Sequence, residues 1–321
     1  MPPLSSRHLS SGDLVADRRL EMARDYAAAG ETIAAAELTE QALELAPEWA
    51  AGWFALGEFR EAAAERAEAD GDAERRAGAI AAYREAARLD PDDRCGAALR
   101  LARLGAAPVP DAPPAAHVRD LFDGYADRYE ASLVSALGYR GPALIERMLD
   151  AHAPGRRFAH ALDLGCGTGL LAPVIRRRVD RLDGVDLAPA MIAKARGGGL
   201  YDTLEVADVT AAMDARTPAS LDLVTAGDVF CYLGDLTPVF TAAARVTSGG
   251  AVVVFTTEAV GEEEVGGEVV LRDSLRWAHR RSHLERVAAA TGFVVVAIDK
   301  ETLRRDRGRD IVGHAALFTR S

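Results

Sequence analysis

One stretch of the sequence, residues 158–169, constrains the fold more than any other. An apolar run from Phe158 leads to Asp163 and then into the turn Gly165-Cys166-Gly167-Thr168-Gly169, after which a helical pattern begins. Three glycines at alternate positions let the chain reverse tightly, and they let a ligand touch the backbone because no Cβ stands in between. The start of the following helix adds a partial positive potential that suits a carboxylate. The stretch therefore predicts a strand–turn–helix unit that binds a ligand.

The residues after this unit alternate between strand and helix patterns. Helices are expected at 169–179, 189–196 and 236–247, and the strands around them at 159–164, 181–186, 203–207, 221–226 and 251–257. Such a series predicts a parallel sheet with helices on both of its faces. A helix at 273–290 and two final strands at 293–299 and 310–319 follow. The final strand pair favours a Rossmann-like α/β sheet of seven strands, because a dinucleotide-binding sheet would add further parallel units instead.

The first third of the chain has a different pattern. Residues 14–105 are rich in Ala, Glu, Arg and Leu at helical spacing, and two segments resemble tetratricopeptide (TPR) repeats. The matching residues are Ala35, Ala42 and Pro47, then Trp53, Leu56, Gly57, Ala79, Tyr83, Ala86 and Pro91. Pro47 and Pro91 are 44 residues apart, whereas the repeat has about 34 residues. The extra length lies in 61–76, which we interpret as an extended or interrupted first helix, and a plain helical bundle is the alternative.

These patterns divide the chain into three parts. We expect an all-α TPR-like domain at 14–105, a Pro/Ala linker at 106–116 and an α/β domain at 117–321. A repeat array this short buries its faces only on neighbours. We therefore expect the helices to pack on the other domain, or to bind a protein partner or a second copy of the chain.

Composition excludes several classes of protein. The net charge of −11 and the pI of about 5.2 disfavour nucleic acid as a partner. The three cysteines form no CxxC pair, so neither a metal site nor a disulfide framework is expected. No run of about 18 apolar residues could span a membrane, and the N-terminus lacks the apolar core of a signal peptide. We expect a cytoplasmic protein with no membrane partner.

Two further carboxylates strengthen the interpretation of the glycine-rich turn. Asp186 ends the second strand, where a carboxylate can bind both hydroxyls of a ribose, and Asp208 follows the third strand. With the GxGxG spacing, these residues resemble the class I S-adenosylmethionine (SAM)-dependent methyltransferases over 117–321. With the N-terminal repeats, nearly the whole chain resembles predicted methyltransferases that carry a TPR segment.

The resemblance implies SAM as the cofactor and assigns positions to it. Asp163 would lie beside the methionine end, Asp186 would bind the ribose, and Asp208 would accept from the adenine amino group. The cofactor positions are Asp163, Gly165, Gly167, Gly169, Asp186, Leu187, Met191, Asp208, Val209 and Tyr125. Each carboxylate also has a purely structural alternative: Asp163 could cap the turn, Asp186 could be an ordinary residue at a strand end, and Asp208 could cap a helix.

Residues for the methyl acceptor are less constrained by the sequence. Tyr125 could cover the site, because aromatic faces suit a sulfonium, and Tyr139 and Arg304 could bind the substrate, the latter by a bidentate contact to an anionic group. Asp228 lies just past the fourth strand and His279 on the helix predicted at 273–290, so both are candidate catalytic residues. Caps, satisfied turns and core packing are the structural alternatives for all of them.

Three functions remain open at this point. The first is a SAM-dependent methyltransferase that acts on a small molecule or a peptide group, with the TPR-like helices shaping access or recruiting a partner. The second is a TPR adaptor whose methyltransferase fold binds SAM but is weakly active. The third, a nicotinamide oxidoreductase, is disfavoured by the glycine spacing and the strand pattern.

Overall fold

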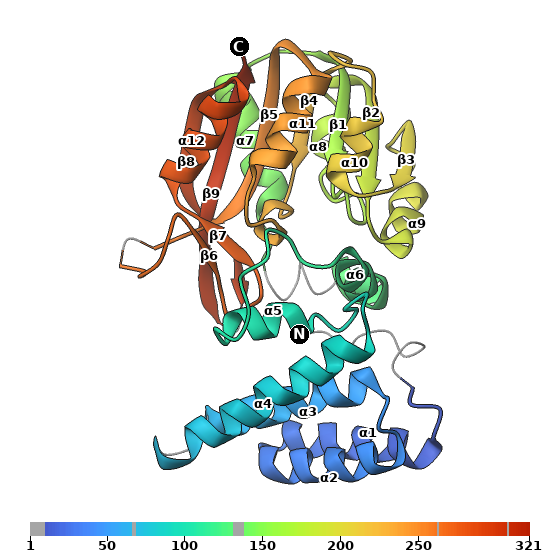
Figure 1. The fold of residues 1–321 in the computed structure, drawn as a ribbon. Coiled ribbons are helices and arrows are strands. Elements are labelled where there is room, and N and C mark those ends of the chain that lie inside the picture. Colours follow the sequence, from blue (N-terminus) through green and yellow to red (C-terminus); the bar gives the residue numbers. More distant parts are fainter. Residues whose placement is uncertain (1–9, 66–68, 131–137, 262, 307) are drawn as a thin grey trace. The chain divides into compact units, whose positions relative to one another are not determined.

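The computed structural model describes residues 10–65, 69–130, 138–261, 263–306 and 308–321. The chain divides into two compact units, Met1–Gly124 and Tyr125–Ser321, and each is described by itself (Figure 1). The boundary lies inside one helix, α6, which spans Ala115–Glu130.

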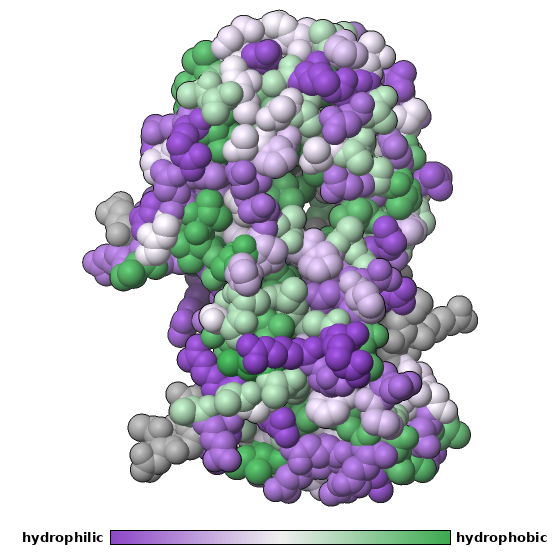
Figure 2. All heavy atoms as spheres, viewed as in Figure 1, coloured by the Kyte–Doolittle hydropathy of each residue, from purple (hydrophilic) through white to green (hydrophobic). Residues whose placement is uncertain are grey.

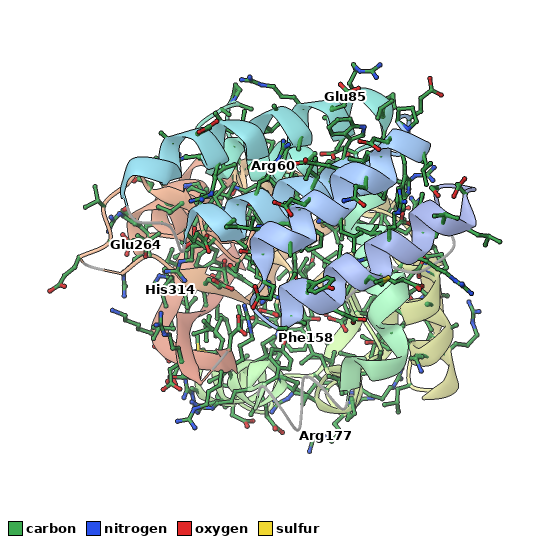
Figure 3. The ribbon with its side chains drawn as sticks, turned by 90° about the horizontal axis from the view of Figure 1, so that it is seen from below. Arg60, Glu85, Phe158, Arg177, Glu264 and His314 are labelled. Atoms are coloured by element: carbon green, nitrogen blue, oxygen red, sulfur yellow. The ribbon has the colours of Figure 1, made fainter. Side chains whose placement is uncertain are left out.

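The first unit consists of helices that pack side by side in chain order (Figure 3). The five helices before α6 are α1 (Leu14–Ala28), α2 (Thr32–Leu45), α3 (Ala50–Ala64), α4 (Ala69–Leu89) and α5 (Ala97–Arg103). Asp13 caps α1, because its side chain accepts from the backbone N–H groups of Val15 and Ala16. The extra length predicted within 61–76 lies at the start of α4, which has 21 residues.

The contact between α3 and α4 depends on a small residue. A Cβ on Gly57 would lie 2.5 Å from Cε1 of Tyr83, so only glycine lets the two helices approach this closely. The Tyr83 hydroxyl donates to the buried Glu61 carboxylate at 2.6 Å, and the Phe54 and Tyr83 rings are 5.4 Å apart. Gly57 and Tyr83 are two of the residues that match the TPR pattern, and the structure brings them into contact.

The second unit is built on a parallel sheet. In the order β3-β2-β1-β4-β5, every neighbouring pair of strands is parallel. The strands are β1 (Phe158–Leu164), β2 (Val179–Asp186), β3 (Thr203–Val206), β4 (Leu221–Ala226) and β5 (Thr247–Ala259). The helices in this part are α7 (Gly141–His152), α8 (Ala172–Arg176), α9 (Pro189–Gly197), α10 (Val209–Asp214), the short 3-10 helix η2 (Phe230–Tyr232) and α11 (Thr237–Val246). The predicted βαβ series is confirmed.

The last part of the chain differs from the sequence prediction. After β6 (Val269–Leu271) comes β7 (Trp277–His279), which pairs with the end of β5, and only then α12 (Arg281–Thr291). The predicted helix at 273–290 is therefore wrong over nearly half of its length, because α12 begins only at Arg281. All three residues of β7 are buried, as in a strand covered on both faces, whereas an amphipathic helix would expose about half of its residues.

The two final strands confirm the predicted ending of the sheet. β9 (Arg309–Arg320) is antiparallel to both β5 and β8 (Phe293–Asp306). Because β6 and β7 join as well, the sheet has nine strands among the described residues, so the expected count of seven was too low.

A cluster of phenylalanine rings packs α11 against the sheet. The ring of Phe240 on α11 lies 5.5–5.7 Å from the rings of Phe230, Phe255, Phe293 and Phe318. These contacts join β5, β8, β9 and η2 into one rigid core. On the face of the molecule that Figure 2 shows, hydrophilic and apolar residues are interspersed.

Candidate functional site

The glycine-rich turn adopts a backbone that requires glycine. Gly165, Gly167 and Gly169 have φ values of +57°, +55° and +93°, in the left-handed region that other residues seldom adopt. A Cβ on Gly165 would also lie 2.5 Å from Cγ2 of Val229. The helix that follows is shorter than predicted, since α8 has only five residues and begins at Ala172. The predicted contribution of a helix N-terminus is correspondingly small.

Asp163 lies beneath this turn at the end of β1. Its side chain is 1% exposed and accepts from the Thr225 hydroxyl at 2.6 Å and from the Tyr201 hydroxyl at 2.7 Å. Burial raises the pKa of this carboxyl to about 6. Neither Thr225 nor Tyr201 was predicted, because Tyr201 lies 38 residues away in a loop and Thr225 lies on another strand.

Asp186 connects the end of β2 to the turn. Its Oδ2 accepts from the Gly167 N–H and its Oδ1 from the Ala188 N–H, both at 2.9 Å. The carboxylate therefore holds the turn in place as well as lying at the carboxyl edge of the sheet, where ligands bind in such folds.

A small cavity adjoins the turn. It measures about 20 Å³ and is lined in part by Tyr139, Asp163, Thr168 and Gly227, which is room for about one water molecule. The Tyr139 hydroxyl fills the neighbouring space, because a Cβ on Gly227 would lie 3.0 Å from it. The Thr168 Oγ1 is buried without a hydrogen-bond partner. A buried carboxylate and an unpartnered hydroxyl at a glycine turn suit the amino-acid end of SAM, provided that the Tyr139 side chain moves.

The residues assigned to the adenine side lie after β2 and after β3, in the loops and at the helix starts that follow these strands. Leu187 is partly buried, while Met191 and Val209 are buried. Asp208 is exposed and caps α10, because its Oδ1 accepts from the N–H groups of Thr210 and Ala211. The structural alternative for Asp208, a helix cap, is thus confirmed.

Tyr125 lies on α6, and its side chain is outside the described part of the chain.

Asp228 and Arg304, predicted separately, form one buried ion pair. The Asp228 Oδ1 lies 2.5 Å from Nη1 of Arg304, whose Nη2 donates to Oε1 of Glu258. The side chains are 7%, 3% and 2% exposed, respectively. Asp228 also has a φ of +59° and donates its N–H to Thr256. Arg304 lies inside β8 rather than in a solvated turn, and this bonding favours a structural role for it.

His279 is held on both ring nitrogens. Its Nδ1 lies 2.8 Å from the Thr257 hydroxyl, and its Nε2 lies 3.0 Å from the carbonyl oxygens of both Leu233 and Gly234. Burial lowers the pKa of His279 to about 4. It belongs to β7 and not to a helix, and this bonding favours a structural role over that of a base.

Arg276 was not among the predicted site residues. Its guanidinium lies 5.2 Å from the ring centroid of Tyr232, which follows β4 on η2. Its Nη1 lies 3.7 Å from Oε1 of Glu258, which is a long contact for an ion pair. Glu258 is also paired with Arg304 and Arg272. Arg276 is about a quarter exposed, so it is a partly accessible cation near the carboxyl edge. No local sequence signal could have identified it, because its neighbours come from other elements.

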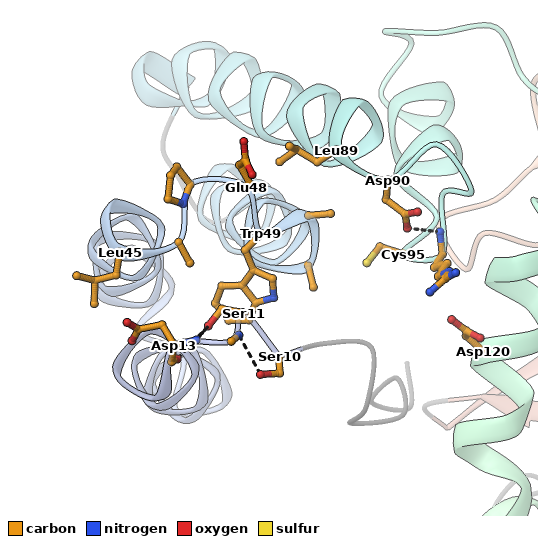
Figure 4. Close-up of a pocket in the computed structure, with 16 residues that line it drawn as sticks. Ser10, Ser11, Asp13, Leu45, Glu48, Trp49, Leu89, Asp90, Cys95 and Asp120 are labelled. Carbon is orange, nitrogen blue, oxygen red and sulfur yellow. Dashed lines mark hydrogen bonds between the residues drawn. The ribbon is translucent and has the colours of Figure 1, made fainter.

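The helical unit carries a larger pocket (Figure 4). The pocket measures about 670 Å³, and Trp49, Leu45 and Leu89 form part of its wall. The charged residues that line it are Asp13, Glu48, Asp90, Asp120 and Arg94. Asp90 accepts from the Arg94 N–H at 2.8 Å. Nothing in the sequence predicted this pocket.

The described residues contain neither a metal-binding cluster nor a membrane-spanning helix. No group of three or more His, Cys, Asp or Glu side chains in the described part is arranged to hold a metal ion. Among the helices described, none is long and apolar enough to cross a membrane.

Comparison with known proteins identifies the centre of the second unit. The family model described as a methyltransferase domain matches residues 162–255, from β1 to β5. This part of the chain is thus similar to a methyltransferase domain. It includes the glycine-rich turn, Asp186 and Asp208, and the cofactor of this domain is SAM.

Curated relatives agree over the same region. The ubiquinone biosynthesis O-methyltransferase of Stutzerimonas stutzeri is 31% identical over 126 residues, which cover 37% of this chain and 54% of that protein. The malonyl-[acyl-carrier protein] O-methyltransferase of Serratia marcescens is 29% identical over 137 residues, covering 41% of this chain and 53% of that protein. The chain thus spans about half the length of these relatives.

A solved structure supports the fold alone. The [4+2]-cyclase SpnF superposes with a TM-score of 0.50 at 15% identity, over 63% of this chain and 96% of that one. Its name is not that of a methyltransferase, which illustrates that this fold does not determine the reaction.

Proposed function

We propose that the chain is a SAM-dependent methyltransferase that acts on a small-molecule acceptor. The observation that carries the proposal is the assembly at one sheet edge of the glycine-rich turn, the buried Asp163 carboxylate and the Asp186 carboxylate bonded to that turn. The match of residues 162–255 to a methyltransferase domain supports it.

The residues present suggest how the cofactor would be held. Asp163 and Thr168 would bind the amino-acid end, and Asp186 would accept from the ribose hydroxyls. The adenine would lie between the loop of Leu187 and the start of α10 at Asp208, with Met191 and Val209 behind. When bound, SAM supplies a methyl group on a positively charged sulfur. At neutral pH a carboxyl with a pKa of about 6 is mostly ionised, so Asp163 can hold a cationic ammonium.

On the acceptor side we assign positioning rather than proton transfer to the protein. Asp228 is already bound to Arg304, and both nitrogens of His279 are occupied. Alignment of the reacting groups supplies most of the rate in such a displacement. The two curated relatives described above are O-methyltransferases, so we propose an oxygen acceptor. Arg276, rather than Arg304, is then the cation available to an anionic group of that acceptor, with Tyr139 beside the cofactor.

Calorimetry with S-adenosylhomocysteine tests the proposal. We expect binding that Asp186→Ala abolishes. The matched control is Asp222→Ala, because Asp222 also accepts two backbone N–H groups, from Ala159 and His160. Asp222 lies at the opposite end of the strands, so its loss should reduce stability without changing the affinity. Binding of NAD in preference to S-adenosylhomocysteine, or equal loss of affinity in both variants, would contradict the proposal.

The TPR-like helices suggest a second candidate function. The pocket of about 670 Å³ in the helical unit favours helices that recruit a partner or shape substrate access for an active enzyme. The alternative is an adaptor protein, in which the helices bind a partner and the methyltransferase unit binds SAM but is only weakly active. Incubation with labelled SAM and fractionated cell extract separates the two. A labelled product supports the enzyme, whereas tight S-adenosylhomocysteine binding with no labelled fraction supports the adaptor.

A further inference from the structure

The first helix of the chain has two apolar faces. Ala16, Leu20 and Ala23 of α1 are buried in the helical unit. Val15, Met22 and Tyr26 lie on a different side of the same helix and are 53%, 52% and 44% exposed. We call these three residues the α1 stripe. They are spaced by seven and four residues, which places them within about 40° of each other around the helix axis.

An apolar stripe of this kind requires an explanation. Single exposed apolar residues are ordinary, but aligned ones on a helix that already buries another face indicate a contact with a second helix. The three side chains, about half-exposed, offer roughly 300 Å² of surface, which is the apolar centre of a small interface rather than of a large one.

The charges beside the stripe indicate which helix it contacts. Arg18 and Asp25 are exposed, lie on the same side of the stripe and have Met22 between them. Their midpoint lies next to Met22, so the pattern is complementary to itself when a second copy runs in the opposite direction.

From this pattern we infer that α1 pairs with α1 of a second copy of the chain, antiparallel and centred on Met22. A two-fold axis places Arg18 of each copy opposite Asp25 of the other, and the two Met22 side chains meet at the axis. A parallel pair would instead place the side of α1 that carries Arg18 and Asp25 opposite the other side of the partner helix, so these two charges would not meet. The inference concerns assembly and is independent of the proposed methyl transfer.

Sedimentation velocity of the full chain tests the dimer. Because the interface is small, we expect a weak dimer that forms as the concentration rises from about 1 to about 100 μM. Met22→Glu should raise the dissociation constant at least about tenfold, because two carboxylates would meet at the axis. The matched control is Val294→Glu, an equally exposed valine of β8 at 54%, and it should leave the dimer unchanged.

Charge reversal tests the orientation. Arg18→Asp and Asp25→Arg should each weaken the dimer, since each places like charges opposite one another twice. An equimolar mixture of these two variants should dimerise again, because every contact between the two different copies then joins opposite charges. The four substituted residues, Met22, Val294, Arg18 and Asp25, are all exposed. Circular dichroism of each variant should therefore show unchanged helix content.

Three results would overturn the inference. One is a monomer over the whole concentration range, and another is a dimer that Met22→Glu and Val294→Glu affect equally. The third is a mixture of the two charge variants that stays monomeric, which would mean that α1 contacts a different helix.

Discussion

Replacing Arg304 by methionine is expected to destabilise the second unit strongly. The change keeps most of the side-chain volume but removes the cation that pairs with Asp228, and Glu258 keeps only its contacts to Arg272 and Arg276. Leaving a buried carboxylate without its partner costs about 3–5 kcal/mol. In a unit of this size each kcal/mol lowers the melting temperature by about 2–4 °C, so we expect a decrease of roughly 10 °C.

Thermal denaturation followed by circular dichroism measures this effect. The control is Arg305→Met, because the neighbouring arginine is mostly exposed and pairs with Asp310 at the surface. It should change stability by less than about 0.5 kcal/mol. Asp228→Asn added to Arg304→Met should recover part of the loss, since asparagine removes the unpaired charge and tolerates the positive φ of this position. If Arg304→Met and Arg305→Met melt alike, the ion pair is not structural, and Arg304 returns as a candidate for substrate binding.

The remaining predictions concern pH and the helical unit. Burial lowers the pKa values of His279 and His314 to about 4 from 6.5, so the folded state loses stability as the pH falls from about 6.5 to 4, by about 3 kcal/mol for each histidine. Asp163, whose pKa is raised to about 6, acts in the opposite direction and offsets part of this loss. Urea unfolding at pH 7.5, 5.5 and 4 measures the sum, and a stability that does not fall with pH would contradict the assignment. Gly57→Ala should separate α3 from α4, because its Cβ would lie 2.5 Å from the Tyr83 ring, and cost about 1–3 kcal/mol. Fluorescence-monitored unfolding of the variant should show this loss, while S-adenosylhomocysteine binding should stay as in the parent.

The sequence predicted the parts of the fold that depend on local patterns. Apolar periodicity and glycine placement located β1 to β5 and the turn after Asp163, because strands, helices and turns are determined mainly by residues close in the chain. The same reasoning failed at Trp277–His279, where three buried residues in succession resemble part of a helix until their pairing with β5 is known.

Contacts between distant segments explain the other differences. Asp228 and Arg304 are 76 residues apart in the chain. The sequence around each residue gives no sign of the other, so each was interpreted as a separate site residue and not as half of an ion pair. The unpredicted hydroxyls of Tyr201 and Thr225 reach Asp163 from separate loops and strands in the same way. Composition and spacing identify which residues can carry charge in a core, but only the fold determines which charge each one meets.

The side chain of Tyr139 has a consequence for the kinetics of ligand entry. Only the fraction of molecules with this side chain turned away can accept the amino-acid end of the cofactor, because the cavity beside the turn measures about 20 Å³. The observed affinity is then the intrinsic affinity multiplied by that fraction. The association rate would stop rising at high ligand concentration, where the rotation of one phenol ring, and not diffusion, sets the speed of binding.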